Sequence, residues 1–379
     1  MTFIVGVGLT QVDRHYDKGL KDLALEAATK ALESTELNRE DIDFVLIASS
    51  VSYLQTRQLD LASYITSSIG LRRARALSVE AGEASGLASA QVALSLIKSG
   101  LAENVLIVGI DKLSDVTSSR AYELLSHLHD VDYEGYYELG FGAVAGILAR
   151  MYMKRYNVDR LTLAYWSTLM HANAKNNPYA MLKFSIRPEA VLDAPPIAEP
   201  LTLLDVPPIS DGAAAVVLSA KSRSSLARLV DVESATSFPS VALQEDPLKI
   251  ESLELAFARL KTKREIEAID VLEIHDSSSI TGILILESLG LANRGEAAKM
   301  LAEGYFSNEG PLVNLSGGLK ARGHPIGATA VYQLAEVAMQ IAGTFPGRKA
   351  QDAQRGLVVS LNAHGSSSYI AYLDRGEEQ

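Results

Sequence analysis

Cysteine is absent from the whole 379-residue sequence. This absence excludes disulfide bonds, thiolate metal ligands and any mechanism with a cysteine nucleophile. Long hydrophobic runs are also missing, because no uncharged apolar stretch reaches about eighteen residues, the length that a membrane-spanning helix needs. Residues 1–20 lack the basic start, apolar run and small-residue cleavage site of a secretion signal. We therefore expect a cytoplasmic protein without membrane spans.

Basic residues are outnumbered, with 35 lysines and arginines against 46 acidic residues and a formal net charge of −11. This balance opposes long-range attraction to nucleic acid or to an anionic membrane, so neither is expected as a partner. A small anionic ligand would need a local basic patch. The length of the chain and its 47% hydrophobic content are sufficient for two substantial cores.

Short apolar segments alternate with helical patterns through the first third of the chain. Residues 3–9 and 43–50 read as buried strands, and residues 20–35 read as an amphipathic helix between them. This order favours a mostly parallel sheet covered by helices. From about Leu229 a similar order returns, with a helix predicted at 251–263. Further on, the sequence predicts a strand at 268–276, a helix at 280–289 and two strands within 355–374.

The chain is therefore predicted to be an α/β protein with two similar halves, residues 1–222 and 223–379. The similarity is in the order of the elements, since no clear sequence repeat is visible. Residues 112–205 differ in composition, because they are rich in tyrosine and proline. They are predicted to form an inserted loop domain with one helix at 145–156. A long insertion in a compact domain is usually a functional region.

Glu83 lies where a predicted strand turns into a helix of small residues, within VEAGEASGLASA at 79–90. A residue at a helix N-terminus meets free backbone N–H groups and the positive end of the helix dipole, which favour an anion. A capping carboxylate without a catalytic role is the alternative interpretation.

Two histidines, like Glu83, are expected at strand-to-loop junctions or in tight turns. His275 ends the predicted strand at 268–276, where an ordinary turn is the alternative interpretation. His324 lies in SGGLKARGHPIGATA at 316–330, whose glycines and proline would hold an imidazole in a narrow cleft beside backbone N–H groups. Such an imidazole can act as a base and as an electrostatic stabiliser. Ligands of α/β folds bind near the carboxyl ends of the strands, where both histidines are expected.

Four ordered segments resemble motifs of the thiolase superfamily, and in particular of its archaeal and sterol-carrier-type members. They are VEAGEASG at 79–86, HANAKNNPYA at 171–180, LLDVPPISDGAAAVVL at 203–218 and the segment around His324. The family makes or breaks carbon–carbon bonds between acyl-coenzyme A thioesters with a cysteine nucleophile, as in acetyl-CoA acetyltransferase. The resemblance places Glu83 where this cysteine normally lies. It implies a thiolase-like fold, with buried mixed sheets layered by helices.

The resemblance also implies roles for the polar residues. His275 would stabilise an enolate or thioester oxygen, and His324 would combine proton withdrawal with donation to an oxyanion. Asn362 and Gly365, in NAHGSSS at 362–368, would replace the second cysteine motif of the family, for which a hairpin turn is the alternative interpretation. Backbone N–H groups near Glu83 and Gly365 would retain oxyanion holes. With Glu83 opposite, we expect the pKa of His324 to be raised.

Coenzyme A or an acyl-CoA is the implied substrate or ligand, with no covalently bound cofactor. We expect the glycine-rich segment to contact it through Ser316, Gly317, Gly318, Lys320 and Arg322, whose two cations could contact phosphates. The resemblance further implies a homodimer or dimer of dimers, joined through the strand before Glu83. A small zinc-ribbon and OB-fold protein is a possible partner.

A metal site is not expected from the sequence. His127 and His129, with Asp130 and Asp132, lack the helical spacing of a zinc protease, and a solvated loop is the simpler interpretation. The GVG near the N-terminus lacks the full dinucleotide-binding fingerprint.

Ordinary thiolysis is not expected, because the mixed anhydride that a carboxylate would form is high in energy compared with a thioester. Two hypotheses remain. The first is altered chemistry, such as enolate-stabilised decarboxylation or non-covalent condensation with Glu83 as base. The alternative is a non-catalytic CoA-binding or scaffold subunit of an acyltransferase complex. The presence of both His275 and His324 favours the first.

Overall fold

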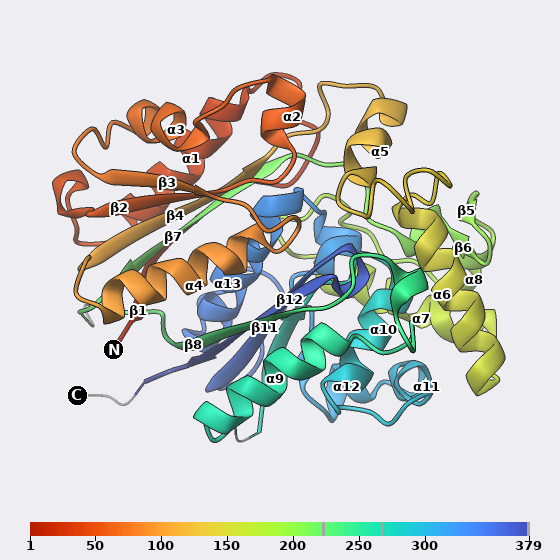
Figure 1. The fold of residues 1–379 in the computed structure, drawn as a ribbon. Coiled ribbons are helices and arrows are strands. Elements are labelled where there is room, and N and C mark those ends of the chain that lie inside the picture. The colour runs from red at the N-terminus through yellow and green to blue at the C-terminus, as the bar shows by residue number, and fades with distance from the viewer. Residues whose placement is uncertain (222–223, 267, 377–379) are drawn as a thin grey trace.

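The computed structural model of the chain describes residues 1–221, 224–266 and 268–376. Ten strands form one hydrogen-bonded sheet with two five-stranded halves (Figure 1). The first half contains β1 (Phe3–Leu9), β2 (Phe44–Ala48), β3 (Arg75–Val79), β4 (Asn104–Asp111) and β7 (Gly212–Ser219). The second contains β8 (Ala227–Thr236), β9 (Val271–Ile274), β10 (Leu312–Val313), β11 (Arg355–Asn362) and β12 (Ser367–Asp374).

The two halves have the same topology. The first runs β1-β7-β4-β2-β3 and the second runs β8-β12-β11-β9-β10. In each half the first two pairings are antiparallel and the last two are parallel. The halves join where β1 pairs with β8. The prediction of two similar α/β halves with mixed sheets is thus confirmed, while the predicted boundary at residues 222 and 223 lies outside the described residues.

Helices form layers around and between the two halves (Figure 1). The amphipathic α1 (Leu20–Glu33) packs against the first half and against α3 (Leu61–Ile69), and α9 (Glu251–Lys263) packs against β8 and β12 of the second. Between the halves lie α4 (Ser85–Lys98) and α13 (Thr329–Ile341), and every residue of α13 is buried. A helix that is buried on all sides is typical of such a central layer.

The inserted region contains more helix than the sequence predicts. It forms α5 (Ser118–Ser126), α6 (Phe141–Tyr156), α7 (Arg160–Ala174) and α8 (Pro188–Leu192), with the short strands β5 (Pro196–Ala198) and β6 (Leu201–Thr202). The expectation of a single helix here was wrong. α7 packs against α10 (Ser279–Ser288), α8 and α11 (Ala297–Ala302), so it buries residues on several faces and shows no simple amphipathic period. Its N-cap, Asp159, is a start signal present in the sequence.

The remaining short elements lie near these packed layers. They include the helices α2 (Ser52–Thr56) and α12 (Tyr305–Asn308), a π-helical turn at Gly318–Arg322 and several single 3-10 turns. Within the described part of the chain, each helix is too short or too polar to cross a bilayer.

Close packing of α4 against α13 positions the site. A Cβ atom at Gly86 would lie 2.7 Å from the backbone nitrogen of Val331 and 2.8 Å from Cβ of Ala330, so these helices can approach only with glycine at residue 86. Glu83 directly precedes α4, and His324 lies shortly before α13. The contact at Gly86 therefore brings two residues, 241 positions apart in the chain, to the same place.

A larger side chain at Gly86 is expected to separate these helices. We predict that Gly86→Val lowers the free energy of unfolding by about 1–3 kcal/mol, the usual cost of overpacking. Chemical denaturation checks this. Gly140→Ser is the control, because Gly140 has open space around it, no positive φ, and lies at the N-cap of α6, where serine is favoured. An equal loss in both variants would contradict the role of the Gly86 contact.

Candidate active site

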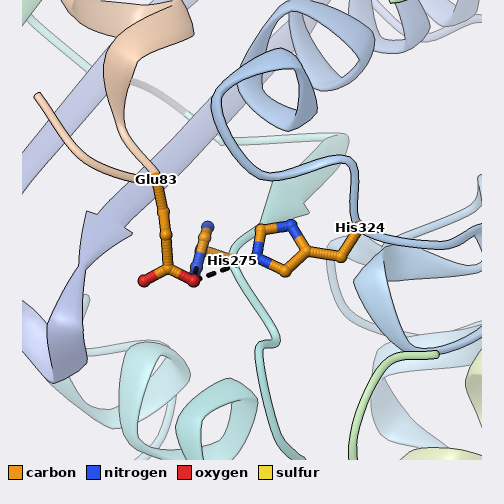
Figure 2. A group of neighbouring side chains, drawn as sticks. All are labelled: Glu83, His275 and His324. Atoms are coloured by element: carbon orange, nitrogen blue, oxygen red, sulfur yellow. Dashed lines mark hydrogen bonds and ion pairs between the residues drawn. The ribbon is translucent and has the colours of Figure 1, made fainter. Parts of the chain in front are cut away.

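A buried carboxylate faces two buried imidazoles, which approach the same carboxylate oxygen (Figure 2). Oε1 of Glu83 is 2.9 Å from Nε2 of His324 and 3.5 Å from Nε2 of His275. The two imidazole rings are nearly perpendicular, at 87°, with their centroids 5.2 Å apart. Three residues that the sequence singles out thus meet, from the turn after β3, the end of β9 and the loop before α13.

Glu83 is held by backbone as well as by side chains. Its Oε2 accepts a hydrogen bond from the backbone N–H of Ala363, at 3.1 Å. Its own backbone N–H donates to Oδ1 of Asn362, at 3.2 Å. The expectation of a free N–H at residue 83 was therefore wrong, because the amide of Asn362 occupies the oxyanion hole that this group was expected to form.

Asn362 supports the turn that carries Glu83. While its Oδ1 accepts from Glu83, its Nδ2 donates to the carbonyl of Leu128 at 3.1 Å and to Oγ of Ser366 at 3.0 Å. The amide is close to Gly82, where a Cβ atom would lie 1.8 Å from Oδ1. An amide engaged on both sides has a positioning role, which agrees with its inability to shuttle protons at neutral pH.

A strained turn follows Asn362. Ala363, His364 and Gly365 have φ values of 40°, 55° and 102°, and the first two are unusual for residues other than glycine. This conformation directs the N–H of Ala363 at Glu83. The predicted Gly365 lies in the same turn, and its carbonyl accepts a hydrogen bond from Oγ of Ser252 at 2.7 Å.

His275 is 1% exposed, yet neither ring nitrogen has a hydrogen-bond partner among the described residues. Its approach to Glu83, at 3.5 Å, is longer than an ordinary hydrogen bond. Buried polar groups are almost always partnered, so this imidazole has unused capacity to bind a ligand.

Asp276 is a site-supporting residue that the sequence did not single out. It accepts hydrogen bonds from Nε1 of Trp166 at 2.9 Å, Nδ2 of Asn314 at 2.9 Å and the N–H of Leu319 at 2.7 Å. Burial raises the pKa of Asp276 to about 6. By connecting α7, the end of β9 and the glycine-rich segment, it fixes the backbone next to His275. The adjacent histidine and aspartate were the only signal in the sequence.

The protonation states of Glu83 and His324 differ from those predicted. Burial lowers the pKa of His324 to about 4, which outweighs the opposite effect of Glu83, so the predicted increase was wrong. Burial alone would raise the pKa of Glu83, but its contacts with His275 and His324 hold it well below its ordinary value. At neutral pH a carboxylate therefore faces a neutral imidazole, whose Nε2–H donates to Glu83. Its Nδ1 then accepts from the hydroxyl of Thr329, 2.7 Å away.

The glycine-rich segment is more deeply buried than expected. Ser316, Gly317, Gly318, Lys320 and Arg322 are all buried. Oγ of Ser316 donates to Glu273 at 2.7 Å, and Nε of Arg322 lies 3.2 Å from Oε1 of Glu336. Burial lowers the pKa of Lys320 to about 8. Buried cations do not reach a phosphate in solvent, which argues against the predicted contact of Lys320 and Arg322 with coenzyme A phosphates.

Glu83 and His324 form the polar end of a largely apolar pocket. Most of its lining comes from the inserted region and from the segment that follows it: Leu113, Tyr122, Leu125, Leu128, Gly142, Ile197, Val206, Pro207, Pro208 and Ile209, with Ile326 beside His324. A ligand whose apolar part enters this pocket would place its polar end at the carboxylate and the imidazole.

The loop at 127–132 was predicted to be solvated, and His127 is indeed exposed. His129 is not, because it is buried and its Nδ1 lies 3.1 Å from Oε2 of Glu134. The prediction of a solvated loop was wrong for this residue.

Comparisons with known proteins cover nearly the whole chain. A family profile described as thiolase, N-terminal domain, matches residues 2–222, and one described as thiolase C-terminal domain-like matches residues 249–375. A protein named acetyl-CoA acetyltransferase from Methanocaldococcus jannaschii is 31% identical, over 97% of this chain and 96% of its own. Sterol carrier protein 2 from Rattus norvegicus is 27% identical, over 98% of this chain and 71% of its own.

Two solved structures share the fold. One is described as Ltp2-ChsH2(DUF35) aldolase and has a TM-score of 0.82 at 21% identity, covering 99% of this chain and 98% of the other. The other, human mitochondrial 3-ketoacyl-CoA thiolase in complex with CoA, has a TM-score of 0.76 at 16% identity, with the same coverage. At these identities the structures establish the fold alone.

The titration of His324 provides a direct test of this electrostatic description. We predict that its ring stays neutral as the pH is lowered from 7 to 5, with a pKa of about 4. Because an unfolded imidazole takes up its proton near pH 6.5, the contribution of His324 makes the free energy of unfolding fall as the pH drops from 6.5 to about 4. Ring-nitrogen NMR, assigned with His324→Gln, measures the pKa.

Glu83→Gln is expected to lower this pKa further, since it removes the opposite charge that favours the imidazolium. Glu103→Gln is the matched control, because Glu103 is half exposed and pairs with Lys221. A pKa above 6.5 in the unmodified protein, or an increase in Glu83→Gln, would contradict the prediction.

Proposed function

The chain belongs to the thiolase family, and we propose that it binds an acyl-CoA thioester with the reacting carbonyl beside Glu83, His275 and His324. The observation that carries this proposal is the carboxylate at the nucleophile position, 2.9 Å from an imidazole at the polar end of an apolar pocket. The apolar lining suits an acyl group. The curated relatives named acetyl-CoA acetyltransferase support the ligand class, and Glu83 changes the reaction.

The reaction that we propose is enolate formation without a covalent acyl-enzyme. The Glu83 carboxylate takes a proton from the α-carbon of the thioester and becomes a carboxylic acid. The electron pair left on that carbon is delocalised onto the thioester oxygen, where the imidazole N–H groups of His275 and His324 stabilise the developing charge. The enolate carbon can then add to the carbonyl of a second thioester, and the carbon–sulfur bond of this adduct breaks to release the thiolate of coenzyme A. The thiolate takes the proton that Glu83 holds, and the condensed thioester is left.

The basicity of Glu83 depends on where His324 donates its proton. In the free protein His324 donates to Glu83, which lowers the pKa of the carboxylate and weakens it as a base. When a thioester oxygen takes over the N–H of His324, this stabilisation is lost and burial raises the pKa of Glu83. Ligand binding would thereby activate the base.

Between the two altered reactions, the charge of Glu83 favours proton abstraction over decarboxylation. A malonyl-type substrate would place a second carboxylate beside a buried carboxylate that is already ionised, and like charges in a buried site repel strongly. A neutral acyl group carries no such cost.

A non-catalytic CoA-binding or scaffold subunit of an acyltransferase complex is the second candidate. It is favoured by one observation, the hydrogen bond from the N–H of Glu83 to Asn362, which closes an expected oxyanion hole. The description Ltp2-ChsH2(DUF35) aldolase names a second component for that fold neighbour, and a small partner protein for this chain is part of the same proposal.

Homodimer formation through β3 also remains a proposal. β3 is the edge strand of the first half, and the side chains of this strand are largely uncovered, with Leu77 being 47% exposed. An uncovered edge strand can pair with a second copy.

Hydrogen exchange at the α-carbon tests the proposed reaction. Incubated with acetyl-CoA in D₂O, the protein is expected to introduce deuterium into the acetyl group, as detected by mass spectrometry. Glu83→Gln should reduce the rate by about 100-fold or more, the usual contribution of a general base. Glu103→Gln, remote from the pocket, should leave it unchanged.

Calorimetry with coenzyme A and acetyl-CoA accompanies this measurement. Binding without deuterium exchange would support the scaffold function and overturn the catalytic one. If neither compound binds, the proposed ligand class is wrong.

A further inference from the structure

Two imidazoles and one carboxylate form the donor set of the site, and this set also suits a metal ion. The ligand atoms of Glu83, His275 and His324 all lie within 4.8 Å of one another. No second group of three such residues comes together within residues 1–221, 224–266 and 268–376. We propose that this triad binds one divalent transition-metal ion, with Zn²⁺ as the expected ion. The inference departs from the expectation of no metal, which rested on the loop at 127–132.

Two of the distances match a coordination shell. Zinc binds histidine nitrogen and carboxylate oxygen at about 2.0–2.2 Å, which places neighbouring ligand atoms roughly 3.0–3.5 Å apart. Oε1 of Glu83 lies 2.9 Å from Nε2 of His324 and 3.5 Å from Nε2 of His275. Both imidazoles present Nε2 toward the same carboxylate oxygen (Figure 2). An ion at this point would replace the proton that Glu83 and His324 share.

His275 provides an independent observation. It is buried, and neither ring nitrogen has a hydrogen-bond partner among the described residues. An imidazole that is buried without a hydrogen bond is costly, and coordination through Nε2 would satisfy that nitrogen. A capping role for Glu83 does not account for the missing hydrogen bonds of His275. The hydrogen bond between Glu83 and His324 does not account for them either.

In two of the three ligand side chains, the polar atom that faces away from the proposed ion already has a hydrogen-bond partner. Nδ1 of His324 lies 2.7 Å from Oγ1 of Thr329, and Oε2 of Glu83 accepts from the N–H of Ala363. These contacts leave Nε2 and Oε1 facing each other. Hydrogen bonds that orient ligands in this way are typical of metal sites, where they fix the ring orientation and increase ligand basicity.

The composition of the site limits which metals it suits. Two histidines and one carboxylate, with positions left for water or substrate, are found around catalytic zinc and around non-heme iron. The chain has no cysteine, so no thiolate competes for the ion or selects Cu(I). Glu83 and His324 also line the apolar pocket, so a fourth coordination position would face a bound ligand.

A bound Zn²⁺ would act as a Lewis acid on an oxygen atom in the pocket, in place of the N–H groups of His275 and His324, because coordination through Nε2 replaces those hydrogens. Its use on a thioester oxygen rests on the proposed function, whereas metal binding itself does not. The two can therefore be tested separately.

Metal content and affinity test the inference on the full-length protein. After removal of metal with a chelator, titration with Zn²⁺ against a competing dye should show one ion bound per chain. Co²⁺ should give the visible absorption bands of a four- or five-coordinate site. Glu83→Gln and His275→Phe should each weaken Zn²⁺ binding by about 100-fold or more, because each removes one of three protein ligands.

His127→Gln is the control, since His127 is an exposed histidine outside the triad. Circular dichroism shows whether each variant is folded, and a Zn²⁺-dependent increase in Tm, present in the unmodified protein and in His127→Gln only, provides a second readout. The inference is overturned if Zn²⁺ and Co²⁺ do not bind stoichiometrically. It is also overturned if both triad variants bind them as the unmodified protein does.

Calorimetry with acetyl-CoA on the metal-free protein separates the two proposals. Binding of acetyl-CoA together with a failure to bind Zn²⁺ rejects the metal site alone. Binding of Zn²⁺ without binding of any acyl-CoA, with or without the metal, rejects the proposed function alone.

Discussion

The packing of α4 against α13 is the constraint on which the site depends. A glycine at residue 86 allows the two helices to approach until a Cβ atom would lie only 2.7 Å from the backbone of Val331. Since Glu83 precedes one helix and His324 precedes the other, the same contact joins a carboxylate from the first half of the chain to an imidazole from the second. His275 and Asn362 then complete the site from the ends of β9 and β11.

The Glu83 carboxylate brings negative charge into a buried place, and the surroundings offset this cost. Glu83 has two oxygens, of which one accepts from the N–H of Ala363 and the other faces both imidazoles. Its ionisation keeps His324 in contact but does not keep it protonated, because desolvation of the imidazolium is the larger effect. Glu83, His275 and His324 thus form one buried polar cluster, for which we propose proton transfer and metal coordination.

Much of the fold follows from local patterns, and the departures have physical causes. The strand at 3–9 was predicted with its observed bounds because it is a short apolar run, buried on both faces of the sheet. The helix at 251–263 was predicted because its buried residues lie on one face. The helix α7 was missed because it buries several faces against other elements of the chain. Lys320 and Arg322 were expected at the ligand because they are the cations next to the glycine-rich turn, but here they are buried and Arg322 pairs with Glu336.

The sequence by itself determined that no thiol is present, and its motifs predicted the thiolase family, with a carboxylate at the position where that family has its nucleophile. These are residue identities and spacings, and they need no coordinates. Only the tertiary structure decided which N–H groups are free, which cations are buried, and in which direction the pKa of His324 moves. Those properties depend on desolvation and on distances between segments far apart in the chain, as between Glu83 and His324, and no local pattern encodes them.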